Sequence, residues 1–306
     1  MLALLAAAAL AFPLPRTQDP APAPEPAAAG EAQEAAPTVE DVLQHYEQAG
    51  LHFLKGPADG DLGRQAHVAV PEGFYFLDAD SARKLLELNE NLTSGHELGA
   101  LWHAGAGLEQ RWWVFFEFEA EGYVKDDDRE IDAEALMENM KEGNQAGNEE
   151  RKKRGWAELR LVGWHKPPFY DPKTNNLTWS TLVESDGGQS VNWRTKLLGR
   201  EGVMSVDLVL TPQKLEGALP AYARLIEGFE YKSGHKYAEF TAGDKIAEYG
   251  LAGLVAGGVG ALAIKTGLFG KLWKLILIPI LAAGAWLKRL FGGSKKQNED
   301  ARPPSS

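Results

Sequence analysis

The acidic run at residues 125–132 is the first stretch whose side chains could do chemistry. It reads KDDDREID, in which Asp126, Asp128 and Glu130 alternate as the carboxylate ligands of a calcium loop might, with Asp127 between the first two. The glycine and the final glutamate that an EF-hand loop needs at its sixth and twelfth positions are absent. Acidic residues before a helix also stabilise its positive N-terminal end. The run is therefore a binding candidate, and the sequence predicts no metal site there.

A polar stripe follows on the helix that this run precedes. Asn144, Asn148 and Arg151 are spaced three or four residues apart, so they share one side of a helix. Such a stripe is usually a solvated face, but asparagine is a poor residue for the middle of a helix, which favours a binding role. If the acidic run and the stripe converge on a pocket, the protein could be an enzyme that acts at a membrane.

Two further pairs are candidates for ligand contact. Trp164 and Tyr170 flank a Pro-Pro pair and could line a groove, although aromatic residues of this kind are most simply core residues. Arg200 and Glu201 lie at the tip of a predicted tight turn, where they could pair with a ligand or with water.

No catalytic or cofactor signature is present in the sequence. The 7 histidines show no H-E-x-x-H or H-x-H spacing, and neither G-x-S-x-G nor the phosphate loop G-x-x-x-x-G-K-[S/T] occurs. The chain has no cysteine, which excludes disulfides, thiolate metal sites and cysteine nucleophiles. We therefore predict no catalytic residue, no metal and no cofactor.

The elements that must position the candidate residues lie between residues 39 and 245. Apolar periodicity predicts helices over 39–50, 78–91 and 133–154, with Thr38 and Asp132 as N-caps. Period-two alternation predicts antiparallel strands around 112–119, 190–199 and 201–210. The apolar face would carry Trp112, Val114, Phe116, Phe118, Val191, Trp193, Thr195, Leu197, Met204, Val206, Leu208 and Leu210, and the face left to water would carry Asn192, Arg194, Lys196, Ser205 and Asp207. The predicted fold class is α+β, an antiparallel sheet of five or more strands with helices packed on it.

The two ends differ from this body in composition. Residues 1–11 form an apolar signal-peptide-like segment or, alternatively, a disordered Ala-rich leader. Residues 12–38 are rich in Pro and Ala and predict a disordered tether. Residues 246–290 are apolar and rich in glycine, and residues 291–306 form a basic and polar tail.

The stretch 246–290 predicts a transmembrane anchor of one or two spans. A spanning helix needs about 20 apolar residues, and the part from 268 to 287 reaches this length if its lysines extend to the interface. Gly253 and Gly257 form a G-x-x-x-G pair that could pack against a second copy or another membrane protein. A buried helix of the body is the less favoured alternative, because each glycine costs about 1 kcal/mol against alanine. Another alternative is a tail that permeabilises bilayers.

Charge excludes one class of partner and favours another. The net charge is -11, and the basic residues near the C-terminus stand out against an acidic body. Phosphate would repel such a body, so we expect no nucleic acid as partner. A basic, apolar tail on an acidic body suits contact with a lipid bilayer.

Five collinear blocks resemble a known bacterial family. They are VPEGFYFLDADSARKLLE, EAEGYVKDDDREIDAEALMENMKEGNQAGNEERKKRGW, LVGWHKPPFYDPKTNNLTWS, VNWRTKLLGREGVMSVDLV and KYAEFTAGDKIAEYGLAGLVAGGVGALAIKTGL. Together they look like the membrane-anchored proteins of domain of unknown function 2167, over nearly all of residues 39–290. The resemblance implies an envelope location, a C-terminal anchor and no established activity. At the level of fold alone, the order of elements resembles the PsbP/Mog-like sandwich.

We therefore expect a membrane protein of the bacterial cell envelope, made with a signal peptide and anchored in the inner membrane by its C-terminal transmembrane segment. Its main domain would be periplasmic, because the positive-inside rule places the basic tail in the cytoplasm. We expect this domain to bind or scaffold a partner rather than to catalyse a reaction.

Overall fold

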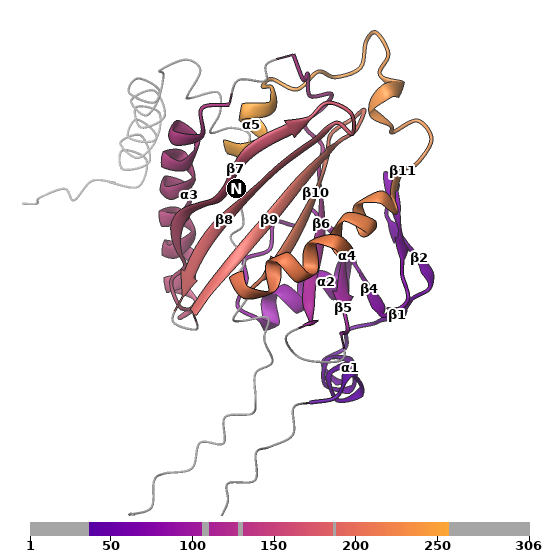
Figure 1. Cartoon of the computed structure of the whole chain (residues 1–306), viewed down its shortest axis with the longest axis vertical. Helices are drawn as coiled ribbons and strands as arrows, with labels where there is room; N and C mark the ends of the chain where they lie inside the picture. The colour runs from indigo at the N-terminus through magenta and orange to yellow at the C-terminus, as the bar shows by residue number, and fades with distance from the viewer. Residues whose placement is uncertain (1–36, 106–109, 128–130, 186–187, 257–306) are drawn as a thin grey trace, which may run out of the picture. The chain divides into compact units, whose positions relative to one another are not determined.

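The computed structural model describes residues 37–105, 110–127, 131–185 and 188–256 (Figure 1). In chain order, the first half contains α1 (Val39–Gln48), β1 (Leu54–Lys55), β2 (Ala58–Leu62), β3 (Ala66–Val70), β4 (Phe74–Asp78), α2 (Ala79–Leu88), β5 (Glu97–His103), β6 (Trp112–Glu119) and α3 (Ala133–Lys153). The second half contains β7 (Arg160–Asp171), β8 (Asn176–Ser185), β9 (Gly188–Leu198), β10 (Val203–Leu210), η2 (Pro212–Lys214), α4 (Leu215–Glu227), β11 (Phe229–Tyr231), η3 (Tyr237–Glu239) and α5 (Leu251–Ala256).

Two antiparallel sheets organise these elements. Eight strands form one sheet in the order β1-β4-β5-β6-β10-β9-β8-β7, and three form another in the order β11-β3-β2. The predicted α+β class is thus confirmed. β3 and β4 are consecutive in the chain, yet they belong to different sheets. β7 runs through the Pro-Pro pair between Trp164 and Tyr170, which is possible because β7 is an edge strand with register shifts.

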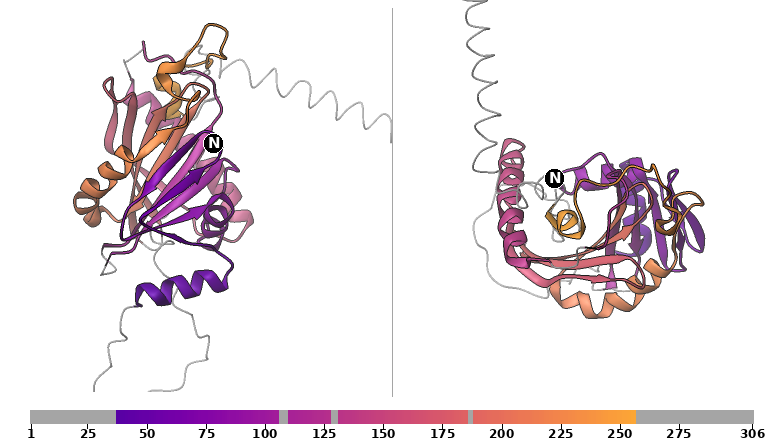
Figure 2. Two further views of the ribbon diagram at one scale, coloured as in Figure 1. Left: turned by 90° about the vertical axis from the view of Figure 1, so that its right-hand side faces the viewer. Right: turned by 90° about the horizontal axis from the view of Figure 1, so that it is seen from above.

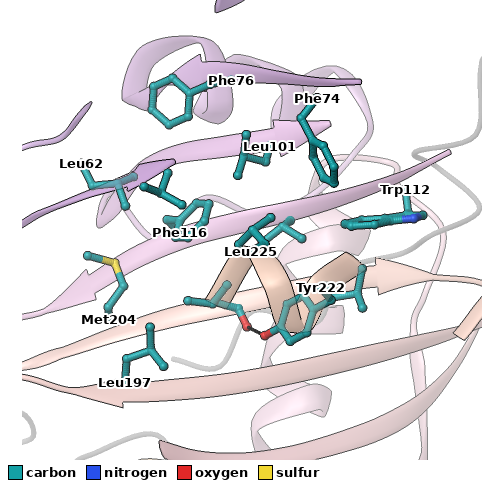
Figure 3. Packing of buried hydrophobic residues seen from close by; sticks show 14 of the residues in the cluster. Leu62, Phe74, Phe76, Leu101, Trp112, Phe116, Leu197, Met204, Tyr222 and Leu225 are labelled. Carbon is teal, nitrogen blue, oxygen red and sulfur yellow. Dashed lines mark hydrogen bonds between the residues drawn. The ribbon is translucent and has the colours of Figure 1, made fainter. Parts of the chain in front are cut away.

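One face of the eight-stranded sheet packs against α4 and the three-stranded sheet, and we call it the α4 face. The buried cluster there includes Val70, Phe74, Phe76, Leu101, Trp112, Val114, Phe116, Phe118, Val191, Leu197, Met204, Val206, Leu208, Leu210, Leu215, Tyr222 and Leu225 (Figure 3). The apolar alternation predicted for β6, β9 and β10 is confirmed by this cluster. The Tyr222 hydroxyl of α4 lies 2.9 Å from Thr195 Oγ1 and 3.0 Å from the Val206 carbonyl oxygen, so it joins the helix to the two central strands.

The opposite face of the sheet carries two separate apolar clusters, and we call it the α2–α3 face. The first cluster joins α1 and α2 to β4, β5, β6 and β10 through Val42, Tyr46, Tyr75, Leu77, Ala82, Leu85, Leu86, Ala100, Trp102, Trp113, Phe115 and Val209. The second joins α3 and α5 to β7, β8, β9 and β10 through Leu136, Met137, Met140, Leu159, Leu161, Leu177, Trp179, Val183, Leu198, Val203, Leu251, Leu254 and Val255. Figure 2 shows the sheet curving around α5, with α3 beside its β7 edge and α4 on the outer side.

Local capping explains where the predicted helices begin. The Thr38 hydroxyl accepts the Asp41 N–H at 3.1 Å while the Asp41 carboxylate accepts the Thr38 N–H at 2.9 Å, a reciprocal cap for α1. Asp132 accepts the Ala135 N–H at 3.1 Å at the start of α3. Both N-caps were predicted, and both are confirmed.

α5 differs from the sequence expectation, because its residues pack in the body instead of beginning a separate anchor. Leu251, Leu254 and Val255 are 0%, 1% and 0% exposed, in the cluster with α3. A Cβ atom on Gly253 would lie 2.4 Å from the Tyr249 ring, so a contact within the chain requires this glycine. Gly257 and the rest of the predicted anchor lie outside the described residues, as do the predicted signal segment and nearly all of the tether. Across the described ranges, no helix is long and apolar enough to cross a membrane.

Candidate functional site

A line of polar side chains separates the two apolar clusters of the α2–α3 face. We call it the polar band, and it consists of Glu97 on β5, Glu117 and Glu119 on β6, Ser205 and Asp207 on β10, and Asn192, Arg194 and Lys196 on β9. The antiparallel register makes the members neighbours, since Ser205 is opposite both Glu117 and Lys196, and Asp207 is opposite Arg194. Directly opposite side chains have Cβ atoms about 5 Å apart, so the members can interact across the strands.

The sequence prediction that this face meets water is wrong. Alternation placed Asn192, Arg194, Lys196, Ser205 and Asp207 together correctly, but each of them is at most 7% exposed. The clusters formed by α1, α2, α3 and α5 cover the sheet on both sides of the band. Alternation tells which residues share a face, whereas the packing of distant helices decides whether solvent reaches it.

Two ion pairs neutralise part of the band. The Arg194 guanidinium binds the Asp207 carboxylate through two hydrogen bonds, from Nε and from Nη2, and Lys196 Nζ donates to Glu119 Oε1. Burial alone would lower the pKa of Arg194, but the Asp207 carboxylate outweighs burial and raises it. Burial would likewise raise the pKa of Glu119, and the charge of Lys196 outweighs it and lowers that pKa. Buried charges are tolerated when they are paired in this way.

Glu97 and Glu117 are different, because neither forms an ion pair with a cation in the described part of the chain. They face each other across β5 and β6, and the Ser94 hydroxyl lies 3.0 Å from Glu97 Oε1 and 3.3 Å from Glu117 Oε2. Burial raises the pKa of Glu117 to about 7, and the Asp207 and Glu97 carboxylates add to the rise against the opposing charges of Arg194 and Lys196.

Several atoms of the band are buried without a hydrogen-bond partner in the described structure. They are Asn192 Nδ2 and Oδ1, Ser205 Oγ and Glu97 Oε2, and the three residues are 6%, 1% and 1% exposed. Buried polar groups almost always have a partner, because leaving one unpaired costs about 1–3 kcal/mol. The band can therefore offer donors and acceptors to another polar group. Among the described residues, no group of three His, Cys, Asp or Glu side chains is placed to hold a metal ion.

The polar stripe of α3 holds that helix to the beginning of β7. Asn148 accepts the Leu159 N–H at 2.9 Å and donates to the Leu159 carbonyl at 2.8 Å, while Asn144 accepts the Leu161 N–H at 3.1 Å. Arg151 donates to the carbonyl oxygens of Ala157 and Glu90. These side chains satisfy backbone groups of other segments.

The acidic run lies at the other end of α3. Asp126 accepts hydrogen bonds from Tyr170 at 2.8 Å and from Tyr237 at 3.3 Å, whereas Asp127 is exposed. Asp128 lies outside the described residues. The acidic run precedes the 21-residue helix α3, whereas Asn144, Asn148 and Arg151 lie in its second half, so the structure does not bring the acidic run and the stripe together.

The remaining candidates also make contacts within the chain. Trp164 Nε1 donates to the Ala133 carbonyl at 2.9 Å, at the start of α3. Arg200 binds Asp244 through two hydrogen bonds of 2.7 and 2.8 Å, which lower the pKa of Asp244. Glu201 lies 3.1 Å from His235 Nδ1 and 3.4 Å from Arg64 Nη2. Arg200 and Glu201 thus tie the turn after β9 to the segment that follows β11.

Sequence reasoning missed the polar band as a site, although one signal was available. Glu117 and Glu119 share their face of β6 with Trp113 and Phe115. A face that mixes large aromatic residues with acids is unusual for a surface that meets only water.

Comparison with known proteins gives a family and distant structural similarities, of which two are described. A protein-family model described as "Protein of unknown function (DUF2167)" matches residues 55–286. The solution structure of cyanobacterial PsbP (CyanoP) from Synechocystis sp. PCC 6803 is similar over 59% of this chain and 92% of that chain, with 11% identity and a TM-score of 0.35. The Ran-binding protein Mog1p of Saccharomyces cerevisiae is similar over 62% of this chain and 98% of that chain, with 9% identity and a TM-score of 0.30. A search of curated proteins gives no match. Structural similarity at this level carries no argument about activity.

Proposed function

The chain belongs to the family described as Protein of unknown function (DUF2167), and we propose that it is a membrane-anchored binding protein of the bacterial envelope. In this proposal the polar band binds a small polar ligand that carries both hydrogen-bond donors and acceptors. The apolar segment after α5 would hold the domain at the inner membrane, on its periplasmic side.

The observation that carries the binding role is the side chain of Asn192. The Asn192 amide is 6% exposed, and neither of its polar atoms has a partner in the described structure. Two residues further along β9, by contrast, Arg194 is paired with Asp207. A carboxamide offers one acceptor and two donor hydrogens, so it recognises a group that presents both. If this buried position had only a structural role, leucine, which has no polar atoms to leave unpaired, would make the protein more stable than asparagine does.

Support for the membrane location comes from composition. Residues 257–290 continue the apolar, glycine-rich sequence that begins in α5, and the basic residues that follow suit the cytoplasmic side of a membrane. The family resemblance implies the same location.

Replacing Asn192 with leucine tests the binding role. If the amide is kept for a ligand, Asn192→Leu will raise the free energy of unfolding of the ligand-free protein by about 1–3 kcal/mol. The same variant will lose the small molecule that native mass spectrometry detects on the wild-type chain extracted from bacterial membranes.

The control is Gln189→Leu, which changes an exposed amide on the same strand and should leave any bound molecule in place. A fall in stability for Asn192→Leu would contradict the proposal, because it would show that the amide satisfies internal hydrogen bonds, for example through buried water. Unchanged retention of a bound molecule in this variant would contradict it equally.

A further inference from the structure

The carboxyl groups of Glu97 and Glu117 both lie within hydrogen-bond distance of the Ser94 hydroxyl, at 3.0 and 3.3 Å. They are opposite residues of β5 and β6, and both side chains are buried. Two carboxylates that share a buried site repel each other, and one of them keeps a proton.

The hydrogen bonds around Ser94 also favour one protonated carboxyl, because of the number of hydrogens available rather than because of charge. The Ser94 oxygen accepts the His96 N–H at 3.1 Å and lies within hydrogen-bond distance of one oxygen of each glutamate. A hydroxyl has one hydrogen and two lone pairs, and an ionised carboxylate supplies no hydrogen. One hydrogen cannot make two full hydrogen bonds, so both contacts reach full strength only when one carboxyl is protonated and donates to Ser94 while Ser94 donates to the other.

The two cations of the polar band form their printed ion pairs with other acids, Arg194 with Asp207 and Lys196 with Glu119. Their charges oppose the rise in the pKa of Glu117, but burial and the neighbouring carboxylates outweigh them. On α2, Arg83 donates to the Glu97 carbonyl at 3.1 Å and pairs with Asp80, so its charge is not directed at the Glu97 carboxyl. The nearby His96 is exposed.

We propose that Glu97 and Glu117 form a proton-binding site in which the two carboxyls share one proton through Ser94, so that the charge of the polar band depends on pH. The Ser205 hydroxyl, which is opposite Glu117 on β10 and has no partner in the described structure, can donate to Glu117 once the proton has left. The site therefore has two hydrogen-bonded states, one protonated and bridged by Ser94, the other ionised and supported by Ser205. This inference does not depend on the proposed ligand.

Infrared titration of the full-length protein with isotope-labelled glutamate tests the proposal. Burial and the neighbouring carboxylates raise the pKa of Glu117 to about 7, so the wild-type protein should show one glutamic acid C=O band that disappears across that pH. Glu117→Gln should abolish this band. Glu97→Gln should shift the remaining titration to lower pH, because it removes a like charge.

Ser205→Ala should shift the titration to higher pH, because it removes the donor for the ionised state. Glu216→Gln, an exposed glutamate on α4, is the matched control and should change nothing. The proposal is overturned if no glutamic acid of the wild-type protein remains protonated above pH 6, a measurement that needs no variant to fold. It is equally overturned if the band persists in a folded Glu117→Gln protein.

Discussion

At the scale of single residues, a polar side chain inside a helix can serve the backbone of another element. Asn148 of α3 pairs with both the N–H and the carbonyl of Leu159, which lies beyond the end of that helix. Its position was predictable from the helical spacing, whereas its partner was not, because Leu159 lies beyond the end of the helix. The partnership of Glu97 and Glu117 was equally unpredictable, because these residues are 20 positions apart in the sequence and adjacent only in the sheet.

Asn148→Ala should lower the free energy of unfolding by about 1–3 kcal/mol, since it leaves two backbone groups of Leu159 without their partners. Chemical denaturation checks this value. Gln145→Ala, an exposed change on the same helix, should have little effect. Equal stability of the two variants would contradict the role given to Asn148.

Glu117 should make stability depend on pH in a defined direction. Burial raises its pKa to about 7 in the folded protein from an ordinary value of 4.5, so between these pH values the folded state binds the proton and the unfolded state does not. Stability should therefore fall as pH rises from about 4.5 to about 7 and level off above it. In Glu117→Gln this fall should disappear. The melting temperature of the variant should therefore rise relative to that of the wild type as pH increases. A constant difference between the two proteins from pH 5 to 8 would contradict the expectation.

At the scale of elements, the short apolar helix α5 has a sequence that fits both a membrane anchor and a buried helix of the body. Its sequence continues into the predicted anchor, but its own apolar side chains complete the cluster between α3 and the sheet. The glycine pattern suggested a membrane contact, whereas Gly253 meets Tyr249 of the same chain. Periodicity and glycine content cannot separate these cases, because a buried surface of protein and a lipid interior select similar side chains.

Leu254→Ala should lower the free energy of unfolding of the body by about 2–5 kcal/mol, because Leu254 is 1% exposed in a packed cluster. Leu88→Ala is the matched control, since Leu88 is 49% exposed on α2. Thermal or chemical unfolding of both variants gives the comparison. No loss in Leu254→Ala would mean that α5 does not pack on the body in solution.

At the scale of the whole molecule, the described body and the apolar C-terminal sequence have different preferred environments. The body buries its apolar side chains in three clusters of its own. Residues 257–290 are apolar and carry few charges, and the proposed membrane anchor rests on that composition.

Removal of residues 257–306 should release the protein from the membrane fraction without unfolding it, because α5 and all three clusters end before this segment. Alkaline carbonate extraction of bacterial membranes compares the two forms. Protease treatment of intact spheroplasts should cleave the body of the full-length protein if it is periplasmic. A full-length chain that remains in the aqueous fraction would contradict the anchor, and a protected body would contradict its orientation.

The sequence by itself determined the helices with their N-caps, the two faces of the central strands and the family to which the chain belongs. These follow from local geometry, since side chains alternate along a strand and repeat every turn of a helix whatever lies nearby. Only the tertiary structure decided that the polar face is buried, that Glu97 meets Glu117, and that α5 packs on α3. Those facts depend on strand order and on helices brought from distant parts of the chain, and hydrophobic burial acts on the assembled surfaces rather than on any one segment.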